Sequence, residues 1–599
     1  MNVEFLTSNS IKAELGAMPE TKGLNFFKED PNLPFILQRY LSKEDYDHAL
    51  SYLTELGEIA GTRLDELSRI ADKHTPELIA FNGKGERINE VDYHPAYKEM
   101  EYVGYGKFGL AAMSHKPVLG FSTKLPHVLK YAFWYLFVQS EFGLACPMSM
   151  TDSGARVLRR YADQDMQDTY LPRLTSTDMK ELWTCAQFMT EKQGGSDVGA
   201  NTLTAKKVGE RWELWGDKWF CSNVSTDLAL VLARPEGASA GTKGLGMFLM
   251  PRKLPDGSLN KFSINRIKDK LGTRDMASGE VAFEGAVAYA VGDVTNGFKQ
   301  MMSMVNSSRL SNAVRSTAMM RRSFLEALIS ARGRVAFGSS IAEKPLMKET
   351  LFELLLDSEA AAAMTFFTAS VYDQADQGSK ADEKLLRILT PLLKGYICKR
   401  ARYSTSEGME ARGGNGYIED WVEPKLVRDA QLGAIWEGTT NIVALDVIRS
   451  LVKDEAGEVF FNTVCNFKGG ISDSLAQQTG KVLLHVTNKI EAQAKKIMNL
   501  NGPERELPAK QLMNRMYHVC AASLLLDEAS LQIKEQGSYR KLYMTLQYLH
   551  RYLLSNGLDD FSYSDSSLLQ WFDAIVDWEQ VPEQAVEALL KQVQRTVKL

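Results

Sequence analysis

A block with the pattern of short strands lies inside a chain whose other parts have the pattern of long helices. In residues 181–295, apolar and polar residues alternate between Gly, Asp and Asn turns, as in LTAKKVGERWELWGDKWFCSNVSTDLALVLARPE (203–236). Alternation with a period of two predicts strands that bury one face, and the frequent turns predict a small antiparallel sheet or barrel. This block restricts the chain to an α-rich fold with a β domain at its centre.

Helical patterns occur on both sides of this block. The segment FILQRYLSKEDYDHALSYLTELGEIAGTRLDELSRIADKH (35–74) has apolar residues at helical spacing, and long amphipathic segments return from residue 297 onward. The chain has 599 residues, whereas a single core rarely exceeds about 250–300 residues, so several domains are expected. We predict a multidomain α fold with a central β-barrel, made of an N-terminal helical domain (1–180), a β-barrel domain (181–295), a four-helix-bundle domain (296–455) and a C-terminal helical domain (456–599).

The charge balance argues against a polyanionic partner. The formal net charge is −5, and basic and acidic residues are nearly balanced in the region 456–599. No global basic field would therefore attract nucleic acid or an anionic membrane, although a local basic patch stays compatible with this composition. We expect no nucleic-acid partner.

Cysteine usage and the absence of targeting patterns predict a location in the cytoplasm. The six cysteines are scattered and none forms a Cys-x-x-Cys pair, so we expect free thiols. The first residues lack a basic region followed by an apolar run, so we expect no signal peptide. The most apolar stretch, AFWYLFV (132–138), is shorter than the roughly 20 residues that a membrane span needs, and we expect no transmembrane segment.

Several common catalytic patterns are missing from the sequence. The eight histidines are widely spaced and form no His-x-x-x-His or His/Cys cluster, so we predict no metal site. There is no Gly-x-Ser-x-Gly elbow and no Walker A motif. The stretch GGNGY (413–417) has the wrong Gly spacing for a dinucleotide fingerprint.

Three other segments contain residues that core packing does not explain. The first is QFMTEKQGGSDVGANT (187–202), where adjacent glycines would let backbone N–H groups approach an anionic ligand. A glycine-rich surface turn is the alternative. The second is GDKWFCSN (216–223), a strand-like run with adjacent aromatic residues, so that one ring faces out of the core if the other faces in. Here the alternative is a strand with both faces covered.

The third segment places a single carboxylate between apolar residues and a flexible glycine. In ARGGNGYIEDWVEPKLVRDAQLGAIWEGTTNIVALDVIR (411–449), Glu437 follows Ile435 and Trp436 and precedes Gly438. A carboxylate in apolar surroundings can have a raised pKa, which makes it a stronger base. From the spacing alone, Glu437 is either such a base or a capping residue before a helix over 440–450.

Together these segments resemble the acyl-CoA dehydrogenases over residues 90–450. The motifs, in order along the chain, are Thr-Glu-x-x-x-Gly-Ser-Asp (190–197), Lys-Trp-Phe-Cys-Ser-Asn (218–223), Arg-x-x-Phe-Gly (334–338), Gly-Gly-Asn-Gly-Tyr (413–417), Lys-Leu-x-Arg-Asp-Ala (425–430) and Trp-Glu-Gly-Thr-Thr (436–440). The family's order of helical domain, β domain and helical bundle agrees with the order of patterns along this chain. The resemblance implies flavin-dependent α,β-dehydrogenation of an acyl-CoA thioester to the trans-2-enoyl-CoA.

The resemblance also implies roles for residues around Glu437. Glu437 matches the family's catalytic base, which abstracts the α-proton while FAD takes the β-hydride, and its backbone N–H matches a donor to the thioester carbonyl. Some relatives carry the base at the position of Ser308, which has no carboxylate here. Arg309 and Gly438 are predicted to lie against the substrate, together with Glu437.

The flavin positions of the family can be matched one by one. Phe220 replaces a common tryptophan, Ser222 a common threonine and Asn441 a common glutamine. The predicted FAD-binding residues are Met189, Thr190, Ser196, Phe220, Cys221, Ser222, Arg334, Phe337, Gly413, Gly414, Thr439 and Asn441. Relatives supply the contacts of Arg334, Phe337, Gly413 and Gly414 from a second subunit, which implies a homodimer or homotetramer.

The region beyond residue 455 sets the chain apart from the shorter dehydrogenases. With Gln-Gly-Gly-Ser-Asp-Val (193–198) and Trp-Glu-Gly-Thr-Thr-Asn-Ile (436–442), the chain most resembles the AidB-like subgroup, whose members carry an extra helical C-terminal domain. We expect an acyl-CoA substrate from fatty-acid metabolism and electron-transferring flavoprotein as electron acceptor. The alternative is an AidB-like flavoprotein that binds DNA or senses fatty acyl-CoA with little turnover. A third interpretation assigns the C-terminal region to oligomerisation or membrane contact.

Overall fold

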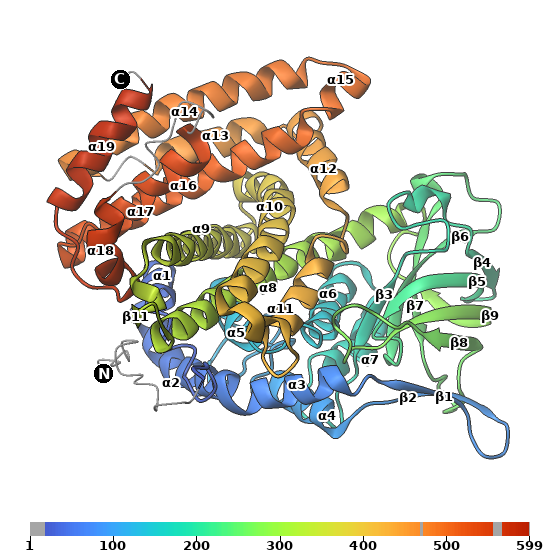
Figure 1. The fold of residues 1–599 in the computed structure, drawn as a ribbon. Coiled ribbons are helices and arrows are strands. Elements are labelled where there is room, and N and C mark those ends of the chain that lie inside the picture. The colour runs from blue at the N-terminus through green and yellow to red at the C-terminus, as the bar shows by residue number, and fades with distance from the viewer. Residues whose placement is uncertain (1–17, 468–470, 555–565, 598–599) are drawn as a thin grey trace. The chain divides into compact units, whose positions relative to one another are not determined.

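The computed structural model describes residues 18–467, 471–554 and 566–597 (Figure 1). The first 17 residues, on which the expectation of no signal peptide rests, lie outside the described residues. The helices up to residue 180 are α1 (Asn32–Tyr40), α2 (Lys43–Ile59), α3 (Asp65–Lys73), α4 (Pro95–Glu101), α5 (His127–Val138), α6 (Ala145–Tyr161) and α7 (Gln164–Leu174). The apolar run 132–138 belongs to α5, which is buried along its whole length.

The strands of the central region are β3 (Cys185–Phe188), β4 (Thr204–Val208), β5 (Arg211–Ser222), β6 (Leu228–Pro235), β7 (Gly246–Pro251), β8 (Phe262–Ile267) and β9 (Ser278–Ala290). Hydrogen bonding closes five of them into a barrel in the order β6–β4–β5–β9–β7 and back to β6. The predicted β-barrel is therefore confirmed. Strand β3 extends the barrel in parallel beside β6, and β8 extends it in antiparallel beside β9.

Long helices follow the barrel, as the sequence pattern predicted. They are α8 (Gly297–Gly333), α9 (Pro345–Asp376), α10 (Lys380–Arg412), α11 (Glu423–Gly433) and α12 (Thr440–Val452), with the short strands β10 (Val335–Ala336) and β11 (Ser339–Ser340) between α8 and α9. The C-terminal helices are α13 (Ala456–Asn466), α14 (Ser474–Met498), α15 (Gly502–Glu506), α16 (Ala509–Gln536), α17 (Arg540–Leu549), α18 (Ser567–Val576) and α19 (Gln584–Val597).

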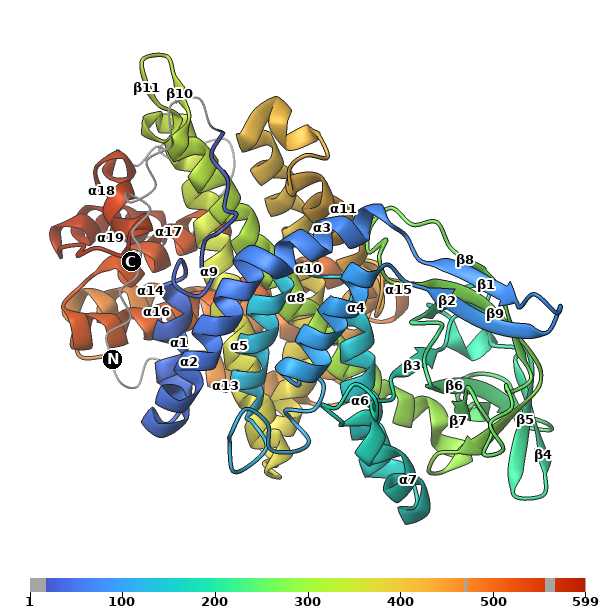
Figure 2. The same cartoon turned by 90° about the horizontal axis from the view of Figure 1, so that it is seen from below.

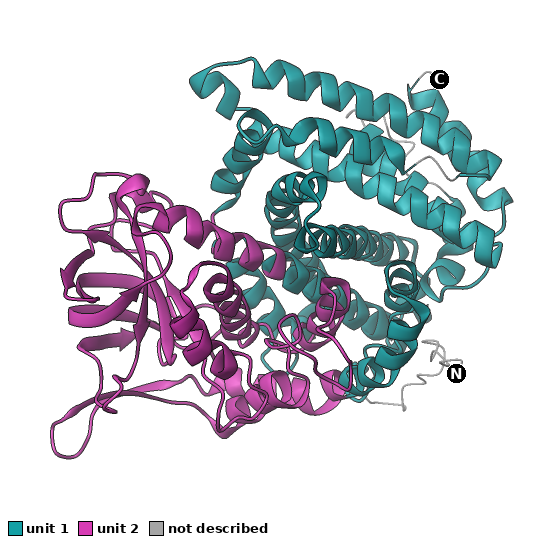
Figure 3. Ribbon diagram, turned by 180° about the vertical axis from the view of Figure 1, so that it is seen from behind, with its two compact units in different colours: residues 1–58, 312–435, 439–599 teal, residues 59–311, 436–438 magenta. Residues whose placement is uncertain are grey.

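The described chain divides into two compact units (Figure 3). Unit 1 comprises residues 1–58, 312–435 and 439–599, and unit 2 comprises residues 59–311 and 436–438. In unit 1, α16 packs against α9, α14 and α17, and α10 packs against α9, α11 and α12. The C-terminal helices therefore share one core with the bundle helices that precede them.

One helix of unit 1 is long and apolar enough to cross a membrane. This helix is α9, and 94% of its most apolar 18-residue window is buried inside the protein. Its buried face includes the run of alanines 360–363, which lets neighbouring helices approach closely. Such burial is typical of the core helix of a bundle.

A β hairpin within the N-terminal region departs from the helical pattern expected there. Strands β1 (Glu77–Phe81) and β2 (Arg87–Asp92) pair in antiparallel, and Figure 2 shows them beside β8. The amide Nδ2 of Asn89 donates to the carbonyl of Phe262 at 2.8 Å, which ties the hairpin to β8. Because each strand is short and only partly buried, the pair gives little periodic signal in the sequence.

Candidate active site

Glu437 lies in the connection between α11 and α12 with its backbone in the left-handed region. Its φ is +57°, and the following Gly438 has a φ of +98°. Helix α12 begins at Thr440 with Thr439 in the N-cap position, so Glu437 is not the cap of that helix. A bulky residue rarely adopts a left-handed conformation, and such outliers gather at functional sites because the surrounding structure must hold them.

Three side chains of unit 2 hold the Glu437 turn. Arg309 of α8 is buried and its Nε donates to the Glu437 carbonyl at 3.0 Å. Gln187 of β3 donates from Nε2 to Oε1 of the Glu437 carboxylate at 3.1 Å. The ring of Trp436 stacks on Phe142, with centroids 5.6 Å apart and planes 21° apart. The structure thus brings the predicted base together with the predicted substrate residue Arg309.

The loop after β3 carries three of the predicted flavin residues, and a buried ion pair organises it. Lys218 and Glu191 are buried, and Nζ of Lys218 lies 2.8 Å from Oε1 of Glu191 and 3.1 Å from the carbonyl of Met189. Burial alone would raise the pKa of Glu191, but Lys218 and hydrogen bonds from Thr202 and Gln193 lower it to about 2. The carbonyl of Thr190 accepts from the Trp219 N–H at 2.8 Å, so both Met189 and Thr190 are fixed through their backbone.

The two glycines of this loop leave room close to Thr190. A Cβ at Gly195 would lie 2.7 Å from Oγ1 of Thr190, whereas Gly194 has a φ of +130°, which other residues rarely adopt. Ser196 is exposed beside them. An open backbone with an exposed hydroxyl matches the chemistry of a pyrophosphate contact, so the residues present fit the predicted role.

Strand β5 presents the remaining flavin residues of unit 2. Its register with β9 shifts between Lys218 and Cys221, so a bulge interrupts the alternation there. The side chain of Phe220 is 53% exposed, Cys221 is buried and Ser222 is half-buried. An exposed aromatic plane and an accessible hydroxyl fit an isoalloxazine ring, whereas the Cys221 side chain belongs to the barrel core.

The remaining predicted flavin residues belong to unit 1. Strands β10 and β11 are joined by Phe337 and Gly338, with φ values of +53° and +81°, and the Phe337 side chain is 95% exposed. Nη1 of Arg334 donates to the Arg412 carbonyl at 3.1 Å and would lie 3.6 Å from a Cβ at Gly413. Arg334 and Gly413 are thus neighbours. Gly414 has open space above it, and Thr439 and Asn441 are exposed at the start of α12.

Three family models match this chain. They are the AidB N-terminal domain over residues 17–180, the acyl-CoA dehydrogenase middle domain over residues 186–286 and the acyl-CoA dehydrogenase C-terminal domain over residues 295–452. Acyl-CoA dehydrogenase family member 11 of Caenorhabditis elegans is 34% identical over 436 residues, which cover 71% of this chain and 70% of that protein. The chain belongs to the acyl-CoA dehydrogenase family.

One further relative and one solved structure agree with this membership. AidB of Escherichia coli (strain K12) is 35% identical over 413 residues, which cover 67% of this chain and 74% of AidB. The solved structure of Caenorhabditis elegans ACDH-11 in complex with C11-CoA has a TM-score of 0.83 and 27% identity, and the match covers 96% of this chain and 99% of that one. The resemblance to the AidB-like acyl-CoA dehydrogenases is therefore confirmed. Members of the family are flavoproteins that use FAD, so the prediction of a FAD-dependent dehydrogenase is confirmed at the level of the family.

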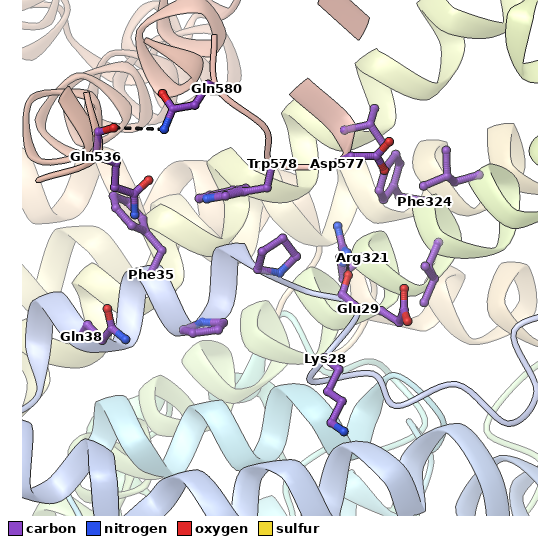
Figure 4. A pocket seen from close by; sticks show the side chains of 15 residues that line it. Lys28, Glu29, Phe35, Gln38, Arg321, Phe324, Gln536, Asp577, Trp578 and Gln580 are labelled. Carbon is purple, nitrogen blue, oxygen red and sulfur yellow. Dashed lines mark hydrogen bonds between the residues drawn. The ribbon is translucent and has the colours of Figure 1, made fainter. Parts of the chain in front are cut away.

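Unit 1 of this acyl-CoA dehydrogenase contains a cavity that none of the predicted site residues lines. It has a volume of about 500 Å³ and is lined by residues of α1 and α8, by the segment before α1 and by the segment after α18 (Figure 4). These residues include Glu29, Phe35, Arg321 and Trp578. Burial is the largest influence on Glu29 and raises its pKa to about 7, although Arg321 opposes the shift. Since none of the flavin motifs contributes to this cavity, it is distinct from the predicted catalytic centre.

Two features of the site are not evident from the motifs. Gln187 is the first residue of the segment 187–202, and its role has no local signal because its contact with Glu437 spans 250 positions of sequence. The ion pair of Glu191 with Lys218 joins two motifs that lie apart in the sequence. The two charges lie 27 positions apart in the sequence, so neither motif alone predicts the ion pair. No group of three metal-ligating side chains occurs among residues 18–467, 471–554 and 566–597.

Proposed function

We propose that this chain oxidises an acyl-CoA thioester to the trans-2-enoyl-CoA, with Glu437 as the base that takes the α-proton. The observation that supports this most is the Glu437 turn, where a carboxylate is held in a left-handed conformation by Gln187 and Arg309. A thioester α-proton is only weakly acidic, so its removal needs a base fixed in position and donors near the carbonyl oxygen. The backbone N–H of Glu437 is the donor that we assign to the thioester carbonyl.

FAD, when bound, supplies the acceptor for the β-hydride. We assign its ring to Met189, Thr190, Phe220 and Ser222, since these residues offer fixed backbone, an exposed aromatic plane and hydroxyls. Ser196, Thr439 and Asn441 are assigned to the rest of the cofactor. The chain's own part is to hold the ring beside the substrate and to exclude water from the reacting carbons.

The second group of flavin residues supports an oligomer. Phe337 is almost fully exposed at the tip of its hairpin, and Arg334 and Gly413 lie next to each other in unit 1. An exposed aromatic side chain in a family motif fits a contact with the FAD of a second subunit. We therefore propose a homodimer or homotetramer in which each flavin site takes residues from two chains.

The substrate and acceptor are proposed from the relatives. A structural neighbour at 27% identity is described in complex with C11-CoA, which supports a fatty acyl-CoA as the ligand of this chain. We propose electron-transferring flavoprotein as the acceptor. The limits of the three family models support the first three of the four proposed domains, and the cytoplasm remains the proposed location.

An anaerobic titration tests the proposal. Purified holoprotein is mixed with acyl-CoAs of increasing chain length, and the flavin absorbance at about 450 nm is followed. We expect rapid bleaching by at least one chain length and release of the enoyl product on reoxidation. Tight binding without bleaching would instead favour the alternative of an acyl-CoA sensor, which the similarity to AidB keeps as the second candidate. Salt-sensitive binding of duplex DNA would favour the DNA-binding form of that alternative.

A further inference from the structure

Gln187 has a fixed backbone and a side chain that ends on the proposed base. It lies on β3, where it pairs with Leu230 of β6, and its neighbours Ala186 and Phe188 are buried. Its Nε2 donates to Oε1 of Glu437 at 3.1 Å. A strand anchored in a sheet is a rigid support, so the carboxamide reaches the carboxylate from a position that the barrel determines.

We propose that Gln187 is a positioning residue for Glu437, holding the carboxylate in the orientation in which it takes the α-proton. The inference rests on the proposed function, because it concerns how the same base is held. Gln187 touches the base and is not assigned a contact with the reacting carbons. It therefore acts through Glu437.

An amide suits both protonation states of the base. Oε1 of Gln187 is buried and has no hydrogen-bond partner within the described part of the chain. A carboxamide offers two N–H donors on one side and a carbonyl acceptor on the other. The donor side matches a carboxylate, and the acceptor side matches the O–H of a carboxylic acid. A rotation of the amide by half a turn would keep one hydrogen bond to Glu437 before and after the proton arrives.

The proton and electrons of the step are accounted for without Gln187. The α C–H bond breaks, its proton forms an O–H bond on Glu437, and its electron pair becomes the second bond between the α- and β-carbons. The β C–H pair leaves as hydride to FAD, which is reduced by two electrons. Gln187 gains and loses no atom, so its contribution is orientation and the stability of the carboxylate.

A cation in the place of Gln187 would weaken the base. Lys218 beside Glu191 shows the effect in the same unit, since it helps to lower the pKa of that carboxyl to about 2. At the Glu437 turn, the charged group from α8 is Arg309, and its Nε donates to the backbone carbonyl. Two carboxylates, those of Glu141 and Asp275, lie next to Gly143. Gly143 follows Phe142, whose ring stacks on Trp436 beside Glu437. An uncharged donor holds Glu437 while leaving its charge available for the proton.

Exchange of the α-hydrogen isolates the step that Gln187 serves. Holoprotein is incubated in D₂O with a 3-thiaacyl-CoA, in which sulfur replaces the β-carbon so that no hydride can leave, and deuterium uptake at the α-carbon is measured by mass spectrometry across pH. For Gln187→Leu we expect exchange to slow about ten- to a hundredfold, the usual cost of releasing a group that fixes a catalytic side chain. The low-pH limb of the profile should move up by about one unit, because the carboxylate has lost a donor.

A second variant and a matched control separate this role from a general loss of structure. Gln187→Glu keeps the shape but places two carboxyl groups within hydrogen-bond distance, so the low-pH limb should move up further, by about two units. The control is Gln164→Leu, which removes another amide-to-carboxylate bond, from Gln164 to Asp168 at 2.7 Å on the exposed face of α7. The control should keep the wild-type exchange rate, pH profile and flavin content.

The outcomes distinguish the two levels of the proposal. The role of Gln187 would be overturned if both Gln187 variants exchanged within twofold of the wild-type rate and their low-pH limbs lay within about 0.2 pH unit of wild type. Glu437 would then still stand as the base. A wild-type holoprotein that exchanges no α-hydrogen from any chain length would overturn the proposed function, and the role of Gln187 with it.

Discussion

Two glutamates of this molecule use their carboxylates in opposite ways. Glu359 of α9 is buried, and Lys541 and Arg540 of α17 bind it at 2.8 and 3.1 Å. Burial alone would raise its pKa, but these two cations lower it to about 2. Glu437 is half-buried, and its carboxylate accepts from an amide while an arginine binds its backbone. The Glu359 carboxylate is held by two cations that neutralise its charge. The Glu437 carboxylate is held by an uncharged amide and through its backbone, so its negative charge remains available to accept a proton.

The first test of this comparison removes the charge of Glu437, the proposed base. In Glu437→Gln the side chain keeps its shape but can no longer take a proton. We expect the rate of flavin bleaching by acyl-CoA in stopped flow to fall by about 10²- to 10⁴-fold, the usual contribution of a general base. Flavin content and thermal stability should match wild type. Bleaching that kept more than about a tenth of the wild-type rate would show that another group is the base.

The second test removes the charge of Glu359, which two buried cations neutralise. In Glu359→Gln the buried Arg540 loses its carboxylate partner, and the buried Lys541 keeps Glu528 at 2.8 Å but loses Glu359. We expect the free energy of unfolding to fall by about 3–5 kcal/mol, because the Arg540 charge is left buried without a counter-charge. The lowered pKa of Glu359 means that its contribution is present above pH 4.5 and is lost as pH falls toward 2. Denaturant unfolding at pH 7 and pH 3 measures both effects.

Glu383→Gln is the matched control for that measurement. Glu383 pairs with Lys380 at 2.9 Å on an exposed face of α10, and such a pair is worth at most about 1 kcal/mol. If the two variants lost equal stability, the Glu359 cluster would be no more important to the fold than a surface ion pair.

The ion pair of Glu191 with Lys218 neutralises a buried charge, as at Glu359, but it also holds the loop that carries the proposed flavin residues Met189 and Thr190. Lys218→Met removes the cation and leaves Glu191 buried, which should loosen the loop that carries Met189 and Thr190. We expect the Kd for FAD to rise about ten- to a hundredfold, measured by flavin fluorescence on reconstitution of the apoprotein. Lys206→Met on the exposed side of β4 is the control and should bind FAD as wild type does. An unchanged Kd for FAD in Lys218→Met would show that the ion pair stabilises the barrel but does not hold the flavin loop.

Glu29 extends the comparison to a buried carboxyl that cations do not cancel. Burial raises its pKa from 4.5 to about 7, so the folded state binds the proton more tightly than the unfolded state does. Stability from this group is fully present below pH 4.5 and is lost as pH rises through 7. Glu29→Gln should therefore match wild type at pH 4.5 and exceed it by about 1–2 kcal/mol at pH 8.

Unfolding midpoints at those two pH values test this smallest effect. Glu579→Gln, an exposed change close in sequence to Asp577 of the same cavity, should alter stability equally at both pH values. A Glu29→Gln variant that gained nothing at pH 8 would show that the carboxyl is already compensated in the folded protein.

The sequence predicted the architecture well because most of it is periodic. The strands β4 to β9 and the long helices α8 to α10 repeat their patterns over many residues, and the pattern changes near residue 297, where α8 begins. The hairpin β1–β2 was missed because two short, half-exposed strands give little periodicity.

The site was predictable only as far as its motifs were. Glu437, Thr190 and Ser222 were named from local patterns and the family resemblance. The left-handed backbone of Glu437 and the bond from Gln187 depend on how distant segments meet, and spacing within a motif carries no such information. The contacts of the predicted flavin residues with the cofactor stay predictions, as does the contribution of a second chain to them.

The left-handed turn at Glu437 acts as a filter on what evolution or a mutant library can place there. Glycine, asparagine and aspartate adopt a φ of +57° at low cost, whereas valine, isoleucine and threonine do not. A library at position 437 sorted for folded protein should therefore be enriched in the first group and depleted in the second. The same library sorted for turnover should return glutamate. The first selection would report which residues the backbone at position 437 tolerates, and the second would report which residue the reaction requires.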